Sequence, residues 1–120
     1  MIGSVDEDLR ALIDVEVSAQ RGGEKVPLRV WIDTAFNGGL VIPRHQIDEL
    51  GLSKTSSTEA TLADGNVVEL ETFGCYLEWF GKSYRTQVIA NDGQLPLLGT
   101  MLLGSRRLVV DYPQRTLSLE

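Results

Sequence analysis

The 120-residue sequence predicts an all-β fold of the barrel or sandwich type. Two observations predict this class. Several short segments alternate apolar and polar residues, which is the period of a half-buried strand. Clusters rich in glycine, asparagine, aspartate and proline separate these segments at regular intervals, as turns do in all-β proteins. The sequence shows no internal repeat, linker or low-complexity tract, so we expect a single domain over residues 1–120.

The first part of the chain is predicted to hold a hairpin and a short helix. Residues 9–17 and 26–32 alternate in polarity, and the glycine-containing cluster at 21–24 joins them as a hairpin. A short helix or turn is expected over residues 43–50, because proline suits the first helical position and Gly51 the stop.

A second hairpin is predicted where residues 58–62 and 67–72 flank Ala63-Asp64-Gly65-Asn66. Aspartate and glycine accept the positive φ of tight hairpin turns, so this signal is strong. The remaining strands are predicted, in order, at residues 76–80, 84–90, 95–98, 108–112 and 116–119. Thr100 is expected to cap a brief helix that runs through Leu103.

Composition and charge exclude several classes of protein. A formal net charge of −6 argues against nucleic-acid binding, since contacts to phosphates need clustered lysine and arginine. The adjacent pair Arg106-Arg107 is therefore interpreted as a solvated turn. No apolar stretch approaches the ~20 residues that cross a bilayer, and the acidic N-terminus lacks the layout of a secretory signal. We expect a cytoplasmic protein that binds neither nucleic acid nor membrane.

The residue inventory leaves carboxylates as the candidates for catalysis. The chain has one histidine, His45, and one cysteine, Cys75. These are too few for the usual zinc clusters, and they argue against a Ser-His or Cys-His pair. Cys75 lies beside apolar residues without a CxxC partner and is expected to be a packed thiol. We predict no metal site and no organic cofactor.

Asp33 is the residue most strongly marked for chemistry. The apolar run at residues 30–32 delivers its carboxylate directly into a Thr-Ala turn, and a second apolar run follows at 40–42. A carboxylate at the end of a buried strand is costly unless hydrogen bonds receive it, and catalysis is one reason to place it there. The alternative is a turn residue that hydrogen-bonds its own backbone. Asp92 and Asp111 are interpreted in this second way, and Glu69 and Glu71 as a solvated sheet face.

The segment Ile32-Asp33-Thr34-Ala35, followed by a small polar stretch and by apolar residues ending in Pro43, resembles the single-lobed, retroviral-type aspartic peptidases and their bacterial and archaeal relatives. Two further features come in the expected order: the Asp64-Gly65 hairpin, and the run Leu97-Leu98-Gly99 followed by a short helix. The resemblance extends over residues 9–119. It implies a single-lobe, retropepsin-like acid protease barrel with one or two short helices.

The resemblance also implies how the site works. A chain with one such aspartate forms a two-fold homodimer, so that Asp33 of each copy faces the other across the axis. Two carboxylates ~3 Å apart share one proton; the ionised partner activates a water that attacks an extended peptide substrate. The Thr34 hydroxyl bonds across the dimer beside Ala35. Residues Ala63, Asp64, Gly65 and Asn66 form the flap that closes over the substrate.

Ala35 departs from the family pattern, which has glycine at this place. The methyl group is harmless if φ is negative, or narrows the site, or marks a chain that keeps the fold without the activity. The rival hypothesis is therefore an inactive dimer that serves as a peptide-binding or scaffold module. A third hypothesis is a small β-barrel module of unrelated origin. Trp31 and Trp79 are interpreted as core or interface anchors.

Overall fold

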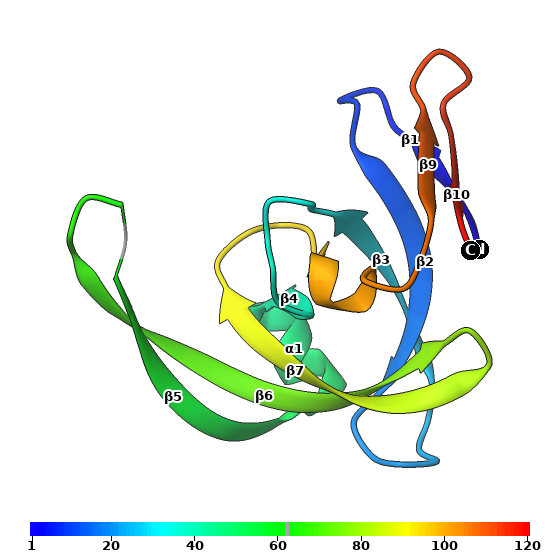
Figure 1. The fold of residues 1–120 in the computed structure, drawn as a ribbon. Helices are drawn as coiled ribbons and strands as arrows, with labels where there is room; N and C mark the ends of the chain where they lie inside the picture. Colours follow the sequence, from blue (N-terminus) through cyan, green and yellow to red (C-terminus); the bar gives the residue numbers. More distant parts are fainter. Residues whose placement is uncertain (62) are drawn as a thin grey trace.

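Within residues 1–61 and 63–120, the part of the chain that the computed structural model describes, ten strands form one continuous sheet (Figure 1). The strands in chain order are β1 (Ile2–Val5), β2 (Ala11–Ser18), β3 (Val26–Ile32), β4 (Leu40–Pro43), β5 (Ser53–Thr61), β6 (Val67–Trp79), β7 (Lys82–Asn91), β8 (Leu97–Leu98), β9 (Leu108–Asp111) and β10 (Thr116–Leu119). The helical elements of these residues are α1 (Arg44–Leu50) and the single 3-10 turn η1 (Thr100–Leu102). The all-β prediction is confirmed.

The sheet curls until strands far apart in its order meet. The order is β5-β6-β7-β4-β8-β3-β2-β1-β10-β9, and β6 also pairs with β2, which gives the centre a barrel-like closure. Neighbouring strands are antiparallel except for two parallel pairs, β3 with β8 and β4 with β7. The short strand β8 is inserted between β3 and β4, although it lies far later in the sequence. Because β8 pairs with both strands, the two ends of the connection between β3 and β4 are held in place.

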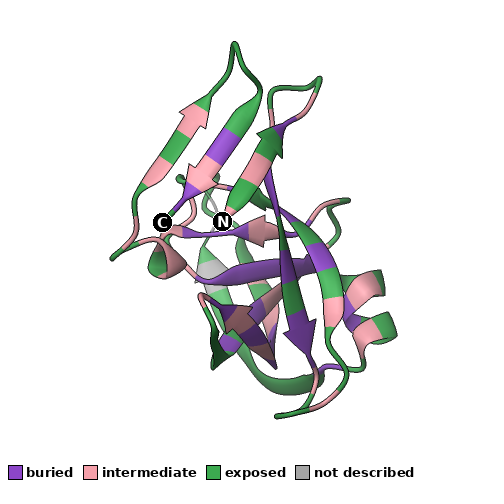
Figure 2. Ribbon diagram, turned by 90° about the vertical axis from the view of Figure 1, so that its right-hand side faces the viewer, coloured by how far each residue is buried: buried purple, intermediate pink, exposed green. Residues whose placement is uncertain are grey.

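The hydrophobic core lies inside the curled sheet. Side chains alternate between the two faces of a strand, so every second residue of β2 and β3 points inward. Figure 2 shows that buried residues line the central strands, whereas the hairpin ends are exposed. The largest fully buried apolar side chains are Ile13, Leu40, Ile42, Ile47, Leu77, Leu98, Leu117 and Leu119. Burying each of these contributes roughly 1.5–3 kcal/mol to the free energy of folding.

The N-terminal segment differs from the prediction. Residues 2–5 form β1, an unpredicted strand that pairs with both β2 and β10. The strand predicted at 9–17 begins only at Ala11, because residues before it form a turn. In that turn Leu9 has a φ of 62°, and its N–H donates to the carbonyl of Asp6 at 3.0 Å. Tertiary pairing with the C-terminal strand, which local sequence does not report, creates β1.

Residues 67–79 form the single strand β6, where the pattern predicts two strands separated near Gly74. The strand stays continuous because Gly74 pairs with Ser53 of β5 on one side and with Gln87 of β7 on the other. Partners on both edges hold the glycine in the sheet despite its low strand preference. The hairpin predicted between residues 58–62 and 67–72 is present as the antiparallel pair of β5 and β6. Its residue Leu62 lies outside the described residues.

Both predicted helical elements are present, but their first residues and their caps differ from the prediction. Helix α1 follows Pro43, which is the last residue of β4 rather than the first helical residue. The predicted Thr100 cap is wrong: Gly99 precedes η1, Thr100 is its first residue, and no side chain caps it. Of the described residues, none belongs to a helix with the length and hydropathy needed to cross a membrane.

Acid should destabilise the fold partly through Asp6 and Asp14. Hydrogen bonds from the Arg10 backbone lower the pKa of Asp6, and those from the Arg29 side chain lower the pKa of Asp14. A lowered native pKa favours the folded state above the ordinary value, near 3.8, and this contribution disappears as the pH falls through the native value. In urea unfolding at pH 6 and pH 3, we expect Asp6→Asn and Asp14→Asn to lose less stability on acidification than wild type. Equal losses would contradict this.

Candidate active site

Asp33 directly follows β3, where the inserted strand β8 runs beside it. Its backbone N–H donates to the carbonyl of Leu98 at 2.9 Å, which extends the parallel β3–β8 ladder past Ile32. Its own carbonyl accepts the N–H of Phe36 at 3.2 Å and closes a tight turn. The sheet topology therefore holds the backbone of Asp33 on both sides, at the point where an apolar strand ends.

One oxygen of the Asp33 carboxylate is bound, and the other is available. Oδ1 accepts the backbone N–H of Ala35 at 3.0 Å. Within the described chain no group donates a hydrogen bond to Oδ2, and the side chain is only partly buried. The bond from Ala35 is the one that a simple turn residue would also form. It orients the carboxylate, and it leaves Oδ2 open for a proton, a water or a second carboxylate.

The segment that follows β8 hydrogen-bonds to the connection between β3 and β4, which contains the Asp33 turn. The N–H of Gly99 donates to the carbonyl of Gly39 at 2.8 Å, and the N–H of Thr100 donates to the carbonyl of Phe36, also at 2.8 Å. The N–H of Met101 donates to the carbonyl of Gly38 at 3.2 Å. Three successive backbone groups thus bind the β3–β4 connection, so that the turn cannot shift without breaking them.

This crossing depends on Gly99 and Phe36. A Cβ on Gly99 would lie 2.7 Å from the carbonyl oxygen of Phe36 and 2.6 Å from its ring, and it would also strike the carbonyl oxygen of Gly38. The ring of Phe36 fills the space that Gly38 and Gly99 leave by having no side chains. The Leu-Leu-Gly run is a sequence signal for Gly99. The sequence does not predict the role of Phe36, because this role depends on the contact of its ring with Gly38 and Gly99 in the folded chain.

The methyl group of Ala35 fits the turn. Positive φ among non-glycine residues of the described chain occurs at Leu9, Phe80 and Arg115, so φ at Ala35 is negative. Ala35 and Thr34 are both exposed to solvent. The possibility that the methyl group is harmless requires a negative φ, and the backbone meets this condition. Glycine is not needed here for its φ.

The predicted flap is a long hairpin of β5 and β6 with Ala63–Asn66 at its tip. The turn is ordered internally: Asp64 accepts the backbone N–H of Asn66 at 2.9 Å and its side-chain amide at 2.8 Å. Gly65 has a φ of 87°, which a side chain would strain. Figure 1 shows that this end of the hairpin stands apart from the β3–β4 connection. A single chain therefore does not bring residues 63–66 against Asp33.

Trp31 is an exposed aromatic residue of β3, two residues before Asp33 in the sequence. The indole is 38% exposed, and the guanidinium of Arg10 lies 5.8 Å from its ring centroid. Asp6 holds Arg10 in place with a 2.7 Å salt bridge. Trp31 is thus a surface residue, whereas Trp79 belongs to the core. The sequence does not predict the contact between Arg10 and Trp31, because a single arginine is not part of any recognisable pattern.

The other candidate side chains do not join Asp33. Cys75 is buried, and its burial raises the pKa of the thiol to about 11, which confirms a packed and unreactive cysteine. His45 is exposed at the start of α1. In residues 1–61 and 63–120, no three His, Cys, Asp or Glu side chains are grouped so that they could hold a metal ion.

Comparison with solved structures identifies the fold. The chain is similar to the EIAV protease complexed with the inhibitor HBY-793, with 18% identity, coverage of 83% of this chain and 90% of that one, and a TM-score of 0.60. It is similar to a retropepsin-like aspartic protease from Rickettsia conorii, with 17% identity, coverage of 99% and 88%, and a TM-score of 0.67. The retroviral protease-like domain of Ddi1 from Leishmania major matches at 10% identity, 91% and 88% coverage, and a TM-score of 0.50.

At the level of sequence, no protein-family model matches the chain, and no curated protein is significantly similar to it. The structural similarities nevertheless show that the chain has the retropepsin-like aspartic protease fold, as the motif around Asp33 predicts.

Proposed function

We propose that this protein is an aspartic endopeptidase that acts as a homodimer, with residues 1–120 forming one catalytic domain. The observation that carries the proposal is the Asp33 turn. The backbone of Asp33 is held by hydrogen bonds to Leu98 of β8 and to Phe36, one carboxylate oxygen is oriented by Ala35, and the other is left open. A turn residue with a purely structural function has no need of so rigid a support.

The dimer follows from the chemistry. Peptide hydrolysis by this route needs a second carboxylate opposite the first, and the chain has one Asp-Thr turn. Thr34 and Ala35 are exposed beside the partly buried Asp33, so a second copy can approach the turn along a two-fold axis. The two turns would then contact each other through Thr34, and each copy would complete the site of the other.

The reaction uses the shared proton of the carboxylate pair. The ionised carboxylate takes a proton from a water held between the two, and the protonated one donates a hydrogen bond to the carbonyl oxygen of the scissile amide. The water oxygen attacks the carbonyl carbon, and the amide nitrogen leaves with a proton returned by the pair. No covalent intermediate forms and no metal is required. Activity should be highest at a pH where the pair holds one proton.

The substrate is proposed to be an extended peptide that lies between the Asp33 pair and the β5–β6 hairpins. Extended peptides bind through backbone hydrogen bonds, and apolar pockets select alternate side chains. The exposed indole of Trp31, two residues before Asp33 in the sequence, is the aromatic surface proposed to contact an apolar side chain of the peptide. At each hairpin tip, Asp64 accepts the backbone N–H and the side-chain amide of Asn66, which supports an ordered turn at the proposed flap.

Cleavage assays on the wild-type protein test the proposal. The purified chain, incubated with a mixed peptide library between pH 3 and pH 7, should cleave peptides and be blocked by a statine-type analogue of the tetrahedral intermediate. Analytical ultracentrifugation should show a dimer at the assay concentration or on addition of the analogue. A protein that cleaves nothing and does not bind the analogue would instead be the inactive peptide-binding module.

Substitution of Ala35 by glycine separates the enzyme from the inactive module. Because the backbone at Ala35 already has a negative φ, Ala35→Gly should lower stability by about 0.5–1 kcal/mol through chain entropy and leave cleavage within roughly tenfold of wild type. Urea unfolding and initial cleavage rates measure the two effects. Activity that arises only in Ala35→Gly would show that the methyl group had silenced the site.

A further inference from the structure

The strand β9 ends the sheet, and one of its two edges has no partner. In the sheet order β9 stands last, beside β10, and no strand of residues 1–61 and 63–120 pairs with its other side. Among the described strands, the outer edge of β5 and the first part of β7 are open as well. An unpaired edge presents backbone N–H and carbonyl groups that another strand can bind. Which strand fits such an edge depends on its backbone pattern and on its charges.

Leu108 and Val110 turn their backbone groups to the open side of β9. Arg107 and Glu120 exchange two hydrogen bonds, of 2.8 Å and 3.1 Å, so they form a hydrogen-bonded pair of the β9–β10 ladder. Such pairs alternate with non-bonded pairs along an antiparallel ladder, so the backbone of Val109 also bonds to β10. The N–H and carbonyl groups of the residues on either side of Val109 therefore face outward.

Two copies of β9 can satisfy these groups by pairing with each other about a two-fold axis at Val109. In this antiparallel register Leu108 of one copy lies opposite Val110 of the other, and each such pair exchanges two hydrogen bonds. All the outward N–H and carbonyl groups of these residues then have partners. The pairing joins the β1-β10-β9 part of each copy into one continuous sheet.

The neighbouring registers of the same strand fit less well. A shift of the axis from Val109 to either adjacent residue would place Leu108 opposite Tyr112, or Val110 opposite Arg106. The N–H of Arg106 already donates a hydrogen bond within the chain at 2.9 Å, and the carbonyl of Tyr112 already accepts one at 3.2 Å. The backbone of β9 thus favours the register centred on Val109.

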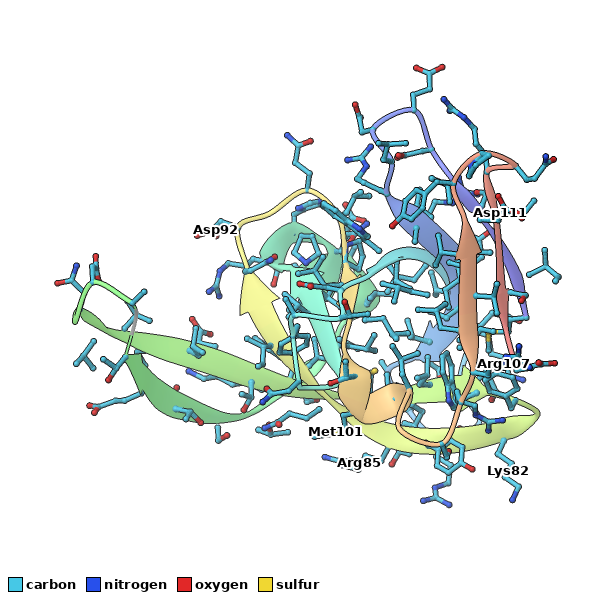
Figure 3. All side chains as sticks on the ribbon, turned by 45° about the horizontal axis from the view of Figure 1, so that its top comes forward. Lys82, Arg85, Asp92, Met101, Arg107 and Asp111 are labelled. Atoms are coloured by element: carbon cyan, nitrogen blue, oxygen red, sulfur yellow. The ribbon has the colours of Figure 1, made fainter. Side chains whose placement is uncertain are left out.

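The same register places opposite charges against each other. Arg107 of one copy lies opposite Asp111 of the other, once on each side of the axis, and Val109 lies opposite its own counterpart. Both charged side chains are exposed, and no salt bridge of the described chain involves either of them. Figure 3 shows Arg107 and Asp111 near the two ends of β9. Directly opposite charges on paired strands stabilise the pairing.

The other open edges do not offer this match. The open part of β7 carries Lys82 and Arg85 and no carboxylate, so two copies of it could form no ion pair. On β5, Lys54 already forms a salt bridge of 3.7 Å with Glu71 of the neighbouring strand β6. In β9, by contrast, the residues between the two charges are all apolar, and Val109 is 45% exposed.

We propose that a second copy of this chain pairs along β9, with the two-fold axis at Val109 and with Arg107 of each copy against Asp111 of the other. This inference rests on the proposed function, because the Asp33 site is incomplete without a second copy. The segment that hydrogen-bonds to the β3–β4 connection continues through η1 into β9, which links the strand at the axis to the Asp33 turn.

Analytical ultracentrifugation of two charge-reversed variants tests the pairing. Arg107→Asp places two carboxylates opposite each other, and Asp111→Arg places two guanidinium groups opposite each other. Each variant by itself should dimerise at least about tenfold more weakly than wild type. An equimolar mixture should dimerise within about threefold of wild type, because only the mixed dimer has opposite charges at both positions. Lys82→Asp, at the exposed first residue of β7, is the matched control and should sediment as wild type.

The neutral variant Asp111→Asn separates repulsion from the loss of one charge. Asparagine keeps an oxygen that can accept a hydrogen bond from Arg107, and it repels nothing. We therefore expect Asp111→Asn to dimerise within about threefold of wild type.

A thiol at the axis tests the register itself. In the proposed dimer, Val109 faces its counterpart as a non-bonded pair, with Cα atoms about 4.5 Å apart, which is close enough for a disulfide. Oxidised glutathione should therefore cross-link Val109→Cys into a dimer on a denaturing gel, whereas Lys82→Cys should stay a single chain. The native Cys75 is buried and should not react.

Failure of the pairing and failure of the proposed function give different results. Sedimentation and cross-linking need no catalysis, so both can be measured in Asp33→Asn. A dimer that behaves as expected but cleaves no peptide would contradict the proposed function and support the β9 pairing. The pairing itself would be overturned if either charge-reversed variant dimerised like wild type. It would also be overturned if the mixture stayed monomeric although circular dichroism showed both chains to be folded.

Discussion

Replacing Asp33 by asparagine should abolish peptide hydrolysis, with a fall in kcat/KM of at least about a thousandfold. Asparagine keeps an oxygen that can accept the Ala35 N–H, so the turn survives, but it can neither take a proton from water nor share one with its partner. The fold should be unchanged, because the turn is held mainly by backbone bonds to Leu98 and Phe36. Cleavage rates and circular dichroism measure the two results.

Asp111→Asn is the matched control for this variant. Asp111 also ends an apolar strand, and its Oδ1 accepts the backbone N–H of Gln114 at 2.9 Å, as Asp33 does for Ala35. We expect full activity from Asp111→Asn. If Asp33→Asn cleaves peptides at a rate comparable to wild type, Asp33 has only a structural role in the turn, and the proposed catalytic mechanism is wrong.

Mixing the two forms tests whether each copy supplies one aspartate. If the active unit is a dimer, a fixed amount of wild type mixed with growing amounts of Asp33→Asn should lose activity as mixed dimers form. A monomeric enzyme would keep its activity per wild-type chain. The same titration with Asp111→Asn should leave activity undiminished, which controls for protein concentration.

Gly99→Ala should be a strongly destabilising change, with a loss of about 2–4 kcal/mol in the free energy of unfolding. The backbone at Gly99 has φ −97° and ψ 176°, which alanine adopts without strain. The cost is therefore steric: the new Cβ would meet the carbonyl oxygens of Gly38 and Phe36, and neither can move without breaking the bonds that pin the Asp33 turn. Cleavage should be lost along with stability.

Gly22→Ala is the control that separates the steric clash at position 99 from the conformational cost of replacing a glycine that has a positive φ. Gly22 has a φ of 70°, and a Cβ there would meet nothing within 4 Å. Its replacement should therefore cost only about 1 kcal/mol, from conformation alone. Urea unfolding of the two variants gives the comparison. A Gly99→Ala variant no less stable than Gly22→Ala would mean that the crossing segment can move aside, and that the Asp33 turn is less rigid than the contacts indicate.

Several elements could be predicted because local sequence specifies them. The alternation in residues 9–17 and 26–32, the Asp64-Gly65 turn and the Leu-Leu-Gly run each carry their own signal. The strands and the hairpin are found close to the predicted places, although the first strand begins at Ala11 instead of residue 9. β1 and the continuous β6 could not be predicted, because both depend on partners elsewhere in the chain. Phe36 and Arg10 were missed for the same reason, since their importance comes from what they contact.

The sequence by itself determined the all-β class, the hairpins and the position of one carboxylate at the end of an apolar strand. These are properties of neighbouring residues, which set polarity period and turn conformation within a few positions. Only the tertiary structure decided that β8 passes between β3 and β4, and that the backbone of Gly99, Thr100 and Met101 binds the connection between β3 and β4. Such features arise from close packing between distant segments, where steric fit and backbone pairing select one arrangement that no local pattern encodes.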